Sequence, residues 1–88
     1  MKVHELKTDP KQFKAVRFGK KTFEIRYNDR NFKVNDVLVL TETQYSKKEM
    51  LNGKPLKYTG KRHNLLITHI LKGPIYGLKD KWVILSVI

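Results

Sequence analysis

The stretch GKKTFEIR, residues 19–26, marks the point where a predicted helix gives way to a predicted strand. The glycine that opens it favours the left-handed conformation in which many helices end. Polar and apolar residues then alternate, as they do along a strand with one buried face. Glu24 and Arg26 lie two residues apart, so they share a face and can form an ion pair. We expect the apolar residues on the opposite face, with Ile25 in the core.

The segments on either side of this stretch predict a mostly β domain with one clear helix. Upstream, residues 2–7 alternate as a short strand does, and the helix is expected near residues 10–18. Thr8 or Asp9 can cap that helix, and Pro10 suits its first position. Downstream, the sequence predicts three more strands, around residues 37–43, 63–71 and 81–88. The total is about five strands.

Two of the predicted strands are apolar on both faces. Residues 37–40 and 82–87 carry apolar side chains at successive positions. Such strands lie between two packed layers or line a closed barrel with a helix against it. We therefore expect an α+β, mostly β fold: a small, mostly antiparallel barrel of five to six strands with one main packed helix. The positions expected to be buried are Phe13, Val16, Ile25, Val37, Val39, Ile67, Trp82, Val83 and Leu85.

Residues 46–62, SKKEMLNGKPLKYTGKR, are polar, basic and punctuated by glycine and proline. This composition predicts a long hairpin excursion with ragged strand ends. Tyr45 lies directly before it and Tyr58 lies within it, and basic residues with interleaved aromatics are typical of a surface for RNA or single strands. An exposed loop that keeps the protein soluble is the alternative. The basic residues concerned are Lys47, Lys48, Lys54, Lys57, Lys61 and Arg62.

The charge balance is the strongest signal in the overall composition. The 88 residues fit one domain, residues 1–88, and include 19 Lys and Arg against 8 Asp and Glu, a net charge of +11. A field of this sign attracts polyanions, of which nucleic acid is the commonest. Lysine-rich surfaces also keep small proteins soluble, so charge alone does not decide the partner.

Several classes of site have no support in the sequence. Cysteine is absent, and the three histidines lack metal-ligand spacing, so we expect no metal and no cofactor. No apolar run approaches the roughly 20 residues that span a bilayer. The N-terminal residues lack the apolar core of a signal peptide. We expect a cytoplasmic monomer that does not bind membranes.

The opening stretch fits the pattern G-x-K-x-x-E-x-R through Gly19, Lys21, Glu24 and Arg26. This pattern resembles the signature of the ASCH superfamily, whose fold is the PUA-like β-barrel. The order of strand, helix and motif strand agrees, as does F-x-V-x-D-V-L at residues 32–38. Asn35 stands where relatives often have glycine, and asparagine tolerates the positive φ of such a turn. The ends VHELKTDP and WVILSVI look like a branch of uncharacterised bacterial and phage proteins, so the resemblance covers nearly the whole chain.

The resemblance implies a cleft around the motif. Lys21 would be a base or an electrostatic anchor, and Arg26 would meet a phosphate or a base edge. Glu24 would hold both cations or accept from a base amino group, and Gly19 would let the backbone approach a ligand. Each residue also has a purely structural interpretation. Lys21 would be a solvated surface lysine, Glu24 and Arg26 would form an ion pair that stabilises the strand, and Gly19 would end the helix.

Three functions compete. The first is an RNA-binding module that uses the motif residues and the excursion: Gly19, Lys21, Glu24, Arg26, Lys47, Lys48, Lys54, Lys57, Tyr58, Lys61 and Arg62. The second is an amidohydrolase acting on an acetylcytidine-like nucleoside with Lys21, Thr22 and Glu24. Related enzymes use a motif lysine, a threonine nucleophile and a downstream glutamate. Here Glu24 stands at the nucleophile's place and the downstream glutamate has no match. The third is an interaction module for an acidic protein.

Overall fold

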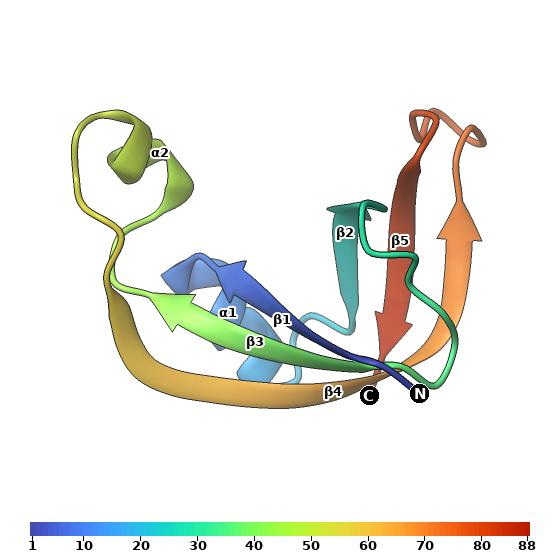
Figure 1. Ribbon diagram of the computed structural model, residues 1–88, viewed down its shortest axis with the longest axis horizontal. Helices are drawn as coiled ribbons and strands as arrows, with labels where there is room; N and C mark the ends of the chain where they lie inside the picture. The colour runs from blue at the N-terminus through green and yellow to red at the C-terminus, as the bar shows by residue number, and fades with distance from the viewer.

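The five strands form one open, mixed sheet in the order β1-β3-β4-β5-β2 (Figure 1). A computed structural model describes residues 1–88. The strands β1 and β3 are parallel, and every other pairing is antiparallel. The elements are β1 (Val3–Thr8), α1 (Pro10–Arg17), β2 (Phe23–Tyr27), β3 (Val37–Thr43), α2 (Lys47–Leu51), β4 (Tyr58–Lys72) and β5 (Trp82–Val87). The small α+β domain and its five strands are therefore confirmed.

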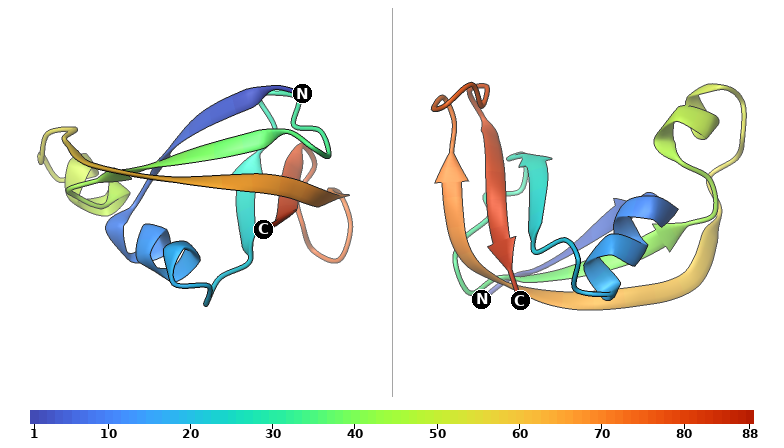
Figure 2. Two further views of the ribbon diagram at one scale, coloured as in Figure 1. Left: turned by 90° about the horizontal axis from the view of Figure 1, so that it is seen from below. Right: turned by 180° about the vertical axis from the view of Figure 1, so that it is seen from behind.

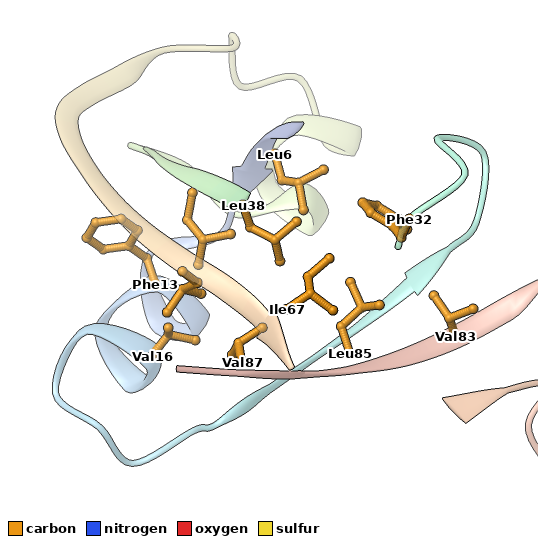
Figure 3. Close-up of a cluster of buried hydrophobic side chains, with 11 residues drawn as sticks. Leu6, Phe13, Val16, Phe32, Leu38, Ile67, Val83, Leu85 and Val87 are labelled. Atoms are coloured by element: carbon orange, nitrogen blue, oxygen red, sulfur yellow. The ribbon is translucent and has the colours of Figure 1, made fainter. Parts of the chain in front are cut away.

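The long strand β4 connects two halves of the sheet. Its first part pairs with β3 and its second with β5, and the register shifts between Ile67 and His69. The strand is bent, so that β2 and β5 stand at an angle to β1 and β3, and α1 lies on the concave side (Figure 2). One hydrophobic core fills this side of the sheet (Figure 3). Its members are Leu6, Phe13, Val16, Phe32, Leu38, Leu40, Leu65, Ile67, Val83, Leu85 and Val87.

Most of the expected core positions are buried, but three are not. Ile25 is 47% exposed and Trp82 is 37% exposed, so both of these predictions are wrong, and Val37 is only half-buried. The alternation of residues in β2 correctly predicted which side chains share a face. The face expected in the core, that of Ile25, is the outer one. The inner face carries Glu24, which is 2% exposed. The apolar side chains of β2 instead share an outer face with Trp82.

The expected closed barrel is not formed, because the edge strands β1 and β2 are not paired with each other. Side chains cross the gap between them instead. Arg26 Nη1 donates to the carbonyl of Lys7 at 3.3 Å, and Arg30 Nη1 donates to the carbonyl of Glu5 at 2.7 Å. The polar side chains of β2 and of the loop that follows it therefore make the contacts with β1 that a strand pairing would otherwise make.

The excursion contains a helix that the sequence analysis missed. Helix α2 begins after Ser46, whose side chain accepts from the amide of Glu49 at 3.1 Å. The carboxylate of Glu49 accepts from the amide of Ser46 at 3.0 Å in return. This is a capping box, and its S-x-x-E pattern was present in the sequence as a signal. The excursion projects from the sheet beside β1 and β3 (Figure 1).

Candidate functional site

The motif begins where α1 ends. Gly19 has a φ of 74°, which confirms the predicted left-handed helix end. The amides of Lys20 and Lys21 both donate to the carbonyl of Ala15, at 2.9 and 3.0 Å, so the chain turns back toward the helix before it enters β2. This turn brings Lys21 beside α1, where its Nζ donates to Gln12 Oε1 at 2.9 Å.

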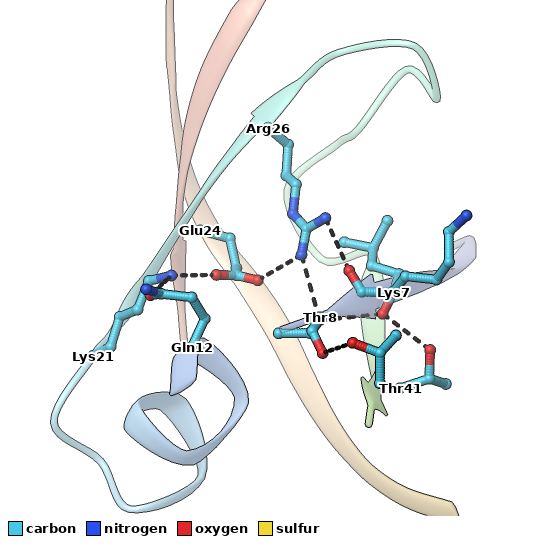
Figure 4. A network of polar contacts seen from close by, with 9 residues as sticks. Lys7, Thr8, Gln12, Lys21, Glu24, Arg26 and Thr41 are labelled. Atoms are coloured by element: carbon cyan, nitrogen blue, oxygen red, sulfur yellow. Dashed lines mark hydrogen bonds and ion pairs between the residues drawn. The ribbon is translucent and has the colours of Figure 1, made fainter. Parts of the chain in front are cut away.

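Glu24 lies at the centre of the motif network (Figure 4). Its Oε2 lies 2.9 Å from Lys21 Nζ, and its Oε1 lies 3.0 Å from Arg26 Nη2. The two basic side chains are themselves only 16% and 26% exposed. A carboxylate buried to this degree is costly unless it is paired and hydrogen-bonded. The structure therefore brings the three charged motif residues together, and the buried carboxylate of Glu24 is paired with two cations.

Arg26 links the motif to β1. Its Nη2 also donates to Thr8 Oγ1 at 3.4 Å, while Nη1 reaches the carbonyl of Lys7. Together with the bond from Arg30 to Glu5, this satisfies two carbonyls two residues apart on the edge of β1. Free carbonyls on an edge strand would otherwise be open to pairing with another chain. The guanidinium is thus held in one orientation by contacts on two strands.

The motif residues line a cleft of about 210 Å³, and a hollow of about 330 Å³ adjoins it. The two share four residues, and the second extends to Arg30 and to Met50 of α2. We call the combined depression the basic groove. Five basic side chains line it against two acidic ones: Lys7, Lys21, Arg26, Arg30 and Lys47 against Asp9 and Glu24.

Lys7 and Lys47 differ from the motif cations because neither is in an ion pair. The carboxylate of Asp9 accepts from the backbone amide of Lys47 at 3.1 Å, which fixes the start of α2 against the junction of β1 and α1. The lysine charge is therefore held at the groove without being neutralised there. Sequence analysis missed six polar residues of the groove, and no local pattern marks them as groove residues: Lys7, Thr8, Asp9, Gln12, Arg30 and Thr43.

The rest of the predicted binding residues lie elsewhere. Three exposed lysines of the excursion are outside the groove: Lys48, Lys54 and Lys57. Tyr58, Lys61 and Arg62 line a separate hollow of about 310 Å³. Arg62 pairs there with Glu5 at 3.2 Å. Of the predicted excursion residues only Lys47 joins the motif, and Gly19 shapes the turn without lining the groove.

The residues named for the hydrolase alternative do not gather in one place. Thr22 is exposed and lines neither hollow of the groove. Glu24 is occupied by two cations, and Lys21 by Glu24 and Gln12. The threonine that does reach the cleft is Thr8, which is buried and accepts from Arg26.

A second buried pair stabilises the turn before β3. Asp36 Oδ2 lies 2.8 Å from His4 Nε2, and the carboxylate also accepts from the backbone amides of Lys2 and Lys33 at 3.0 and 3.1 Å. The hydrogen bond with His4, followed by these amides, lowers the pKa of Asp36 to about 2 against the opposing effect of burial. Asn35 has a φ of 75°, as expected for this turn.

No three His, Cys, Asp or Glu side chains gather where they could hold a metal ion. No helix has both the length and the apolar character needed to cross a membrane.

Fold and groove together define a small, strongly basic α+β domain built on an open five-stranded sheet, with a buried ionic network beside a cationic groove. Residues 3–87 match the family described as "Domain of unknown function (DUF3850)". The chain belongs to this family. No curated protein matches it.

Proposed function

We propose that this domain is a small RNA-binding module. In this proposal the phosphates of a single strand lie along the basic groove, and a base edge or phosphate enters the cleft beside Lys21 and Arg26. Lysine ammonium groups and arginine guanidinium groups are the usual partners of phosphate oxygens. A strand that neutralised them would also release its counterions, which supplies most of the affinity of nucleic-acid binding without sequence preference.

The observation that carries the proposal is the state of charge in the groove. Glu24 neutralises much of the charge of Lys21 and Arg26, while Lys7 and Lys47 remain unpaired on the same lining. Charges held together without partners repel each other, and an anionic ligand relieves that repulsion. The net charge of +11 acts in the same direction over longer distances.

The resemblance of the motif to ASCH domains, with their PUA-like barrel, supports RNA as the polyanion. That resemblance implies a closed barrel, whereas the sheet of this domain has five strands and is open. The exposed lysines of the excursion add a second, weaker contribution in the proposal, because they lie outside the groove and meet phosphates without fixed geometry. Binding would then combine a local contact at the groove with general attraction from the excursion.

A charge-matched pair of double variants tests this proposal. Lys7→Gln with Lys47→Gln removes two groove charges, and Lys48→Gln with Lys57→Gln removes two excursion charges. Affinity for a single-stranded RNA is measured as a function of salt. We expect the groove variant to lose about tenfold in affinity and to lower the slope of log affinity against log salt by about 1.4, since each lost phosphate contact removes about 0.7.

The excursion variant is the control for net charge. We expect its affinity to change by less than about threefold, because loosely placed charges contribute little beyond general attraction. Equal losses in the two variants would reduce the RNA binding to generic electrostatics. An interaction module for an acidic protein would then be the better interpretation.

A further inference from the structure

Another hollow, which contains an unusual carboxylate, lies on the other flank of α1. It has a volume of about 230 Å³ and is lined by Lys14, Arg17, Phe18, Glu42 and Lys61, none of which lines the basic groove. Gln12 and Arg17 are five residues apart on α1, which places them on opposite sides of the buried stripe of Phe13 and Val16. We call this hollow the Glu42 pocket.

Glu42 is 3% exposed and sits on the core face of β3, two residues after Leu40. Its Oε1 accepts from Thr59 Oγ1 at 2.8 Å. Its Oε2 is the only buried side-chain nitrogen or oxygen in the protein that has no hydrogen-bond partner. The large majority of buried side-chain polar atoms have a hydrogen-bond partner, so one without a partner calls for a specific explanation.

The residues at the rim of the pocket indicate what kind of ligand the unpaired oxygen of Glu42 could receive. Three basic residues line the hollow, yet none comes within ion-pair distance of Glu42. Their charges are therefore available to an anionic group. Phe18 is 71% exposed at the same rim and offers an aromatic face. The pocket thus combines an acceptor for one hydrogen bond, a flat stacking surface and a cluster of cations.

We propose that the Glu42 pocket binds a nucleotide whose base carries an exocyclic amino group. The amino group donates to Glu42 Oε2, the base stacks on Phe18, and the phosphate meets Lys14, Arg17 and Lys61. The two lysines at the rim are exposed, and in this proposal the side chains around the hollow move aside to let the base reach the buried oxygen. The volume is below the roughly 300–1,000 Å³ of drug-sized ligand sites, which suits a single base.

The chemistry of one free oxygen selects among bases. Cytosine and adenine offer an amino group to a lone acceptor, and carboxylates accept from the cytosine amino group in nucleic-acid complexes. Uracil places a carbonyl oxygen where cytosine has its amino group, and a carboxylate repels that oxygen. We therefore expect CMP to bind more tightly than UMP. The inference goes beyond the proposed function and does not depend on it, because the two sites share no residue.

The test is calorimetric titration of the full chain with CMP and UMP at low salt. Glu42→Gln keeps the shape of the side chain and the acceptor for Thr59, but replaces the lone oxygen with an amide nitrogen that donates. We expect this variant to lose about tenfold in affinity for CMP and to bind UMP as well or better, so that the preference disappears or reverses. The change also removes a negative charge, so simple attraction of phosphate would move both affinities upward.

Two further variants complete the design. Phe18→Ala, at an exposed position, should weaken both nucleotides alike through lost stacking. Glu5→Gln makes the same change of charge at an exposed carboxylate outside the pocket and should leave the preference for CMP intact. Equal binding of CMP and UMP to the wild type, no binding at millimolar concentration, or an unchanged preference in Glu42→Gln would each overturn the proposal. None of these results bears on RNA binding through the groove, which shares no residue with the pocket.

Discussion

Two buried glutamates flank α1, and their surroundings differ. Glu24 is 2% exposed and both of its oxygens meet a cation, at 2.9 and 3.0 Å. Glu42 is 3% exposed, yet one oxygen meets a threonine hydroxyl and the other meets nothing. Burial is therefore nearly equal while neutralisation is not. A buried carboxylate with full pairing holds a structure together, whereas one with a free acceptor is suited to receive a donor from outside.

The basic residues around the two glutamates also differ, because those at Glu24 are paired and those at Glu42 are not. Lys21 and Arg26 are ordered by Glu24 and by contacts with α1 and β1, so they arrive at the groove with their orientation fixed. Lys14 and Lys61 at the Glu42 pocket have no ion-pair partner and are exposed. Fixed cations favour a ligand of one geometry, because less side-chain entropy is lost on binding. Exposed cations without a partner tolerate several.

The largest effect should come from removing the paired carboxylate. Glu24→Ala leaves two partly buried cations facing each other without their common partner, and we expect a loss of about 3 kcal/mol in the free energy of unfolding. The measurement is chemical denaturation monitored by circular dichroism. Glu5→Ala is the control, since it breaks an exposed pair with Arg62 and should cost less than about 1 kcal/mol. Similar losses in the two variants would contradict a special role for Glu24.

The sequence predicted those features of the fold and the sites that one or two neighbouring residues determine. The end of α1 at Gly19, the start at Pro10 and the positive φ of Asn35 were predicted because backbone sterics at one or two residues decide them. The sharing of a face by Glu24 and Arg26 also follows from the period of a strand.

The orientation of β2 could not be obtained in this way. Alternation alone suggested that Ile25 would be buried, but Glu24 takes that place because Lys21 and Arg26 neutralise it and because β1 supplies acceptors for Arg26. Those acceptors lie 18 and 19 positions away in the sequence. Similarly, the Glu42 pocket combines α1, β3 and β4, and no motif joins these three segments.

An intermediate effect is expected at Asp36, a third buried carboxylate, which is paired with His4. Its pKa is lowered from 3.8 to about 2, so its contribution to stability is complete above about pH 4 and is lost as the pH falls toward 2. The difference amounts to about 2 kcal/mol. The measurement is the difference in unfolding free energy between the wild type and Asp36→Asn at several pH values. That difference should shrink by this amount between pH 5 and pH 2. A difference that stays constant over this range would show that the carboxylate is not stabilised by its charge.

The smallest effect on stability should come from Glu42→Gln, and its contrast with Glu24→Gln sharpens the comparison most directly. Both substitutions keep the shape of the side chain and remove one negative charge. At Glu24 the change weakens two ion pairs, and we expect a loss of about 2 kcal/mol. At Glu42 no cation is within ion-pair distance, so removing the charge also removes a desolvation cost that nothing offsets. We therefore expect the free energy of unfolding of Glu42→Gln to equal that of the wild type or to exceed it by up to about 1 kcal/mol.

Thermal and chemical denaturation without nucleotide would measure the stability of both variants side by side. A loss at Glu42 as large as that at Glu24 would mean that Oε2 already has a partner within the fold, and the pocket would then have no free acceptor to offer a ligand.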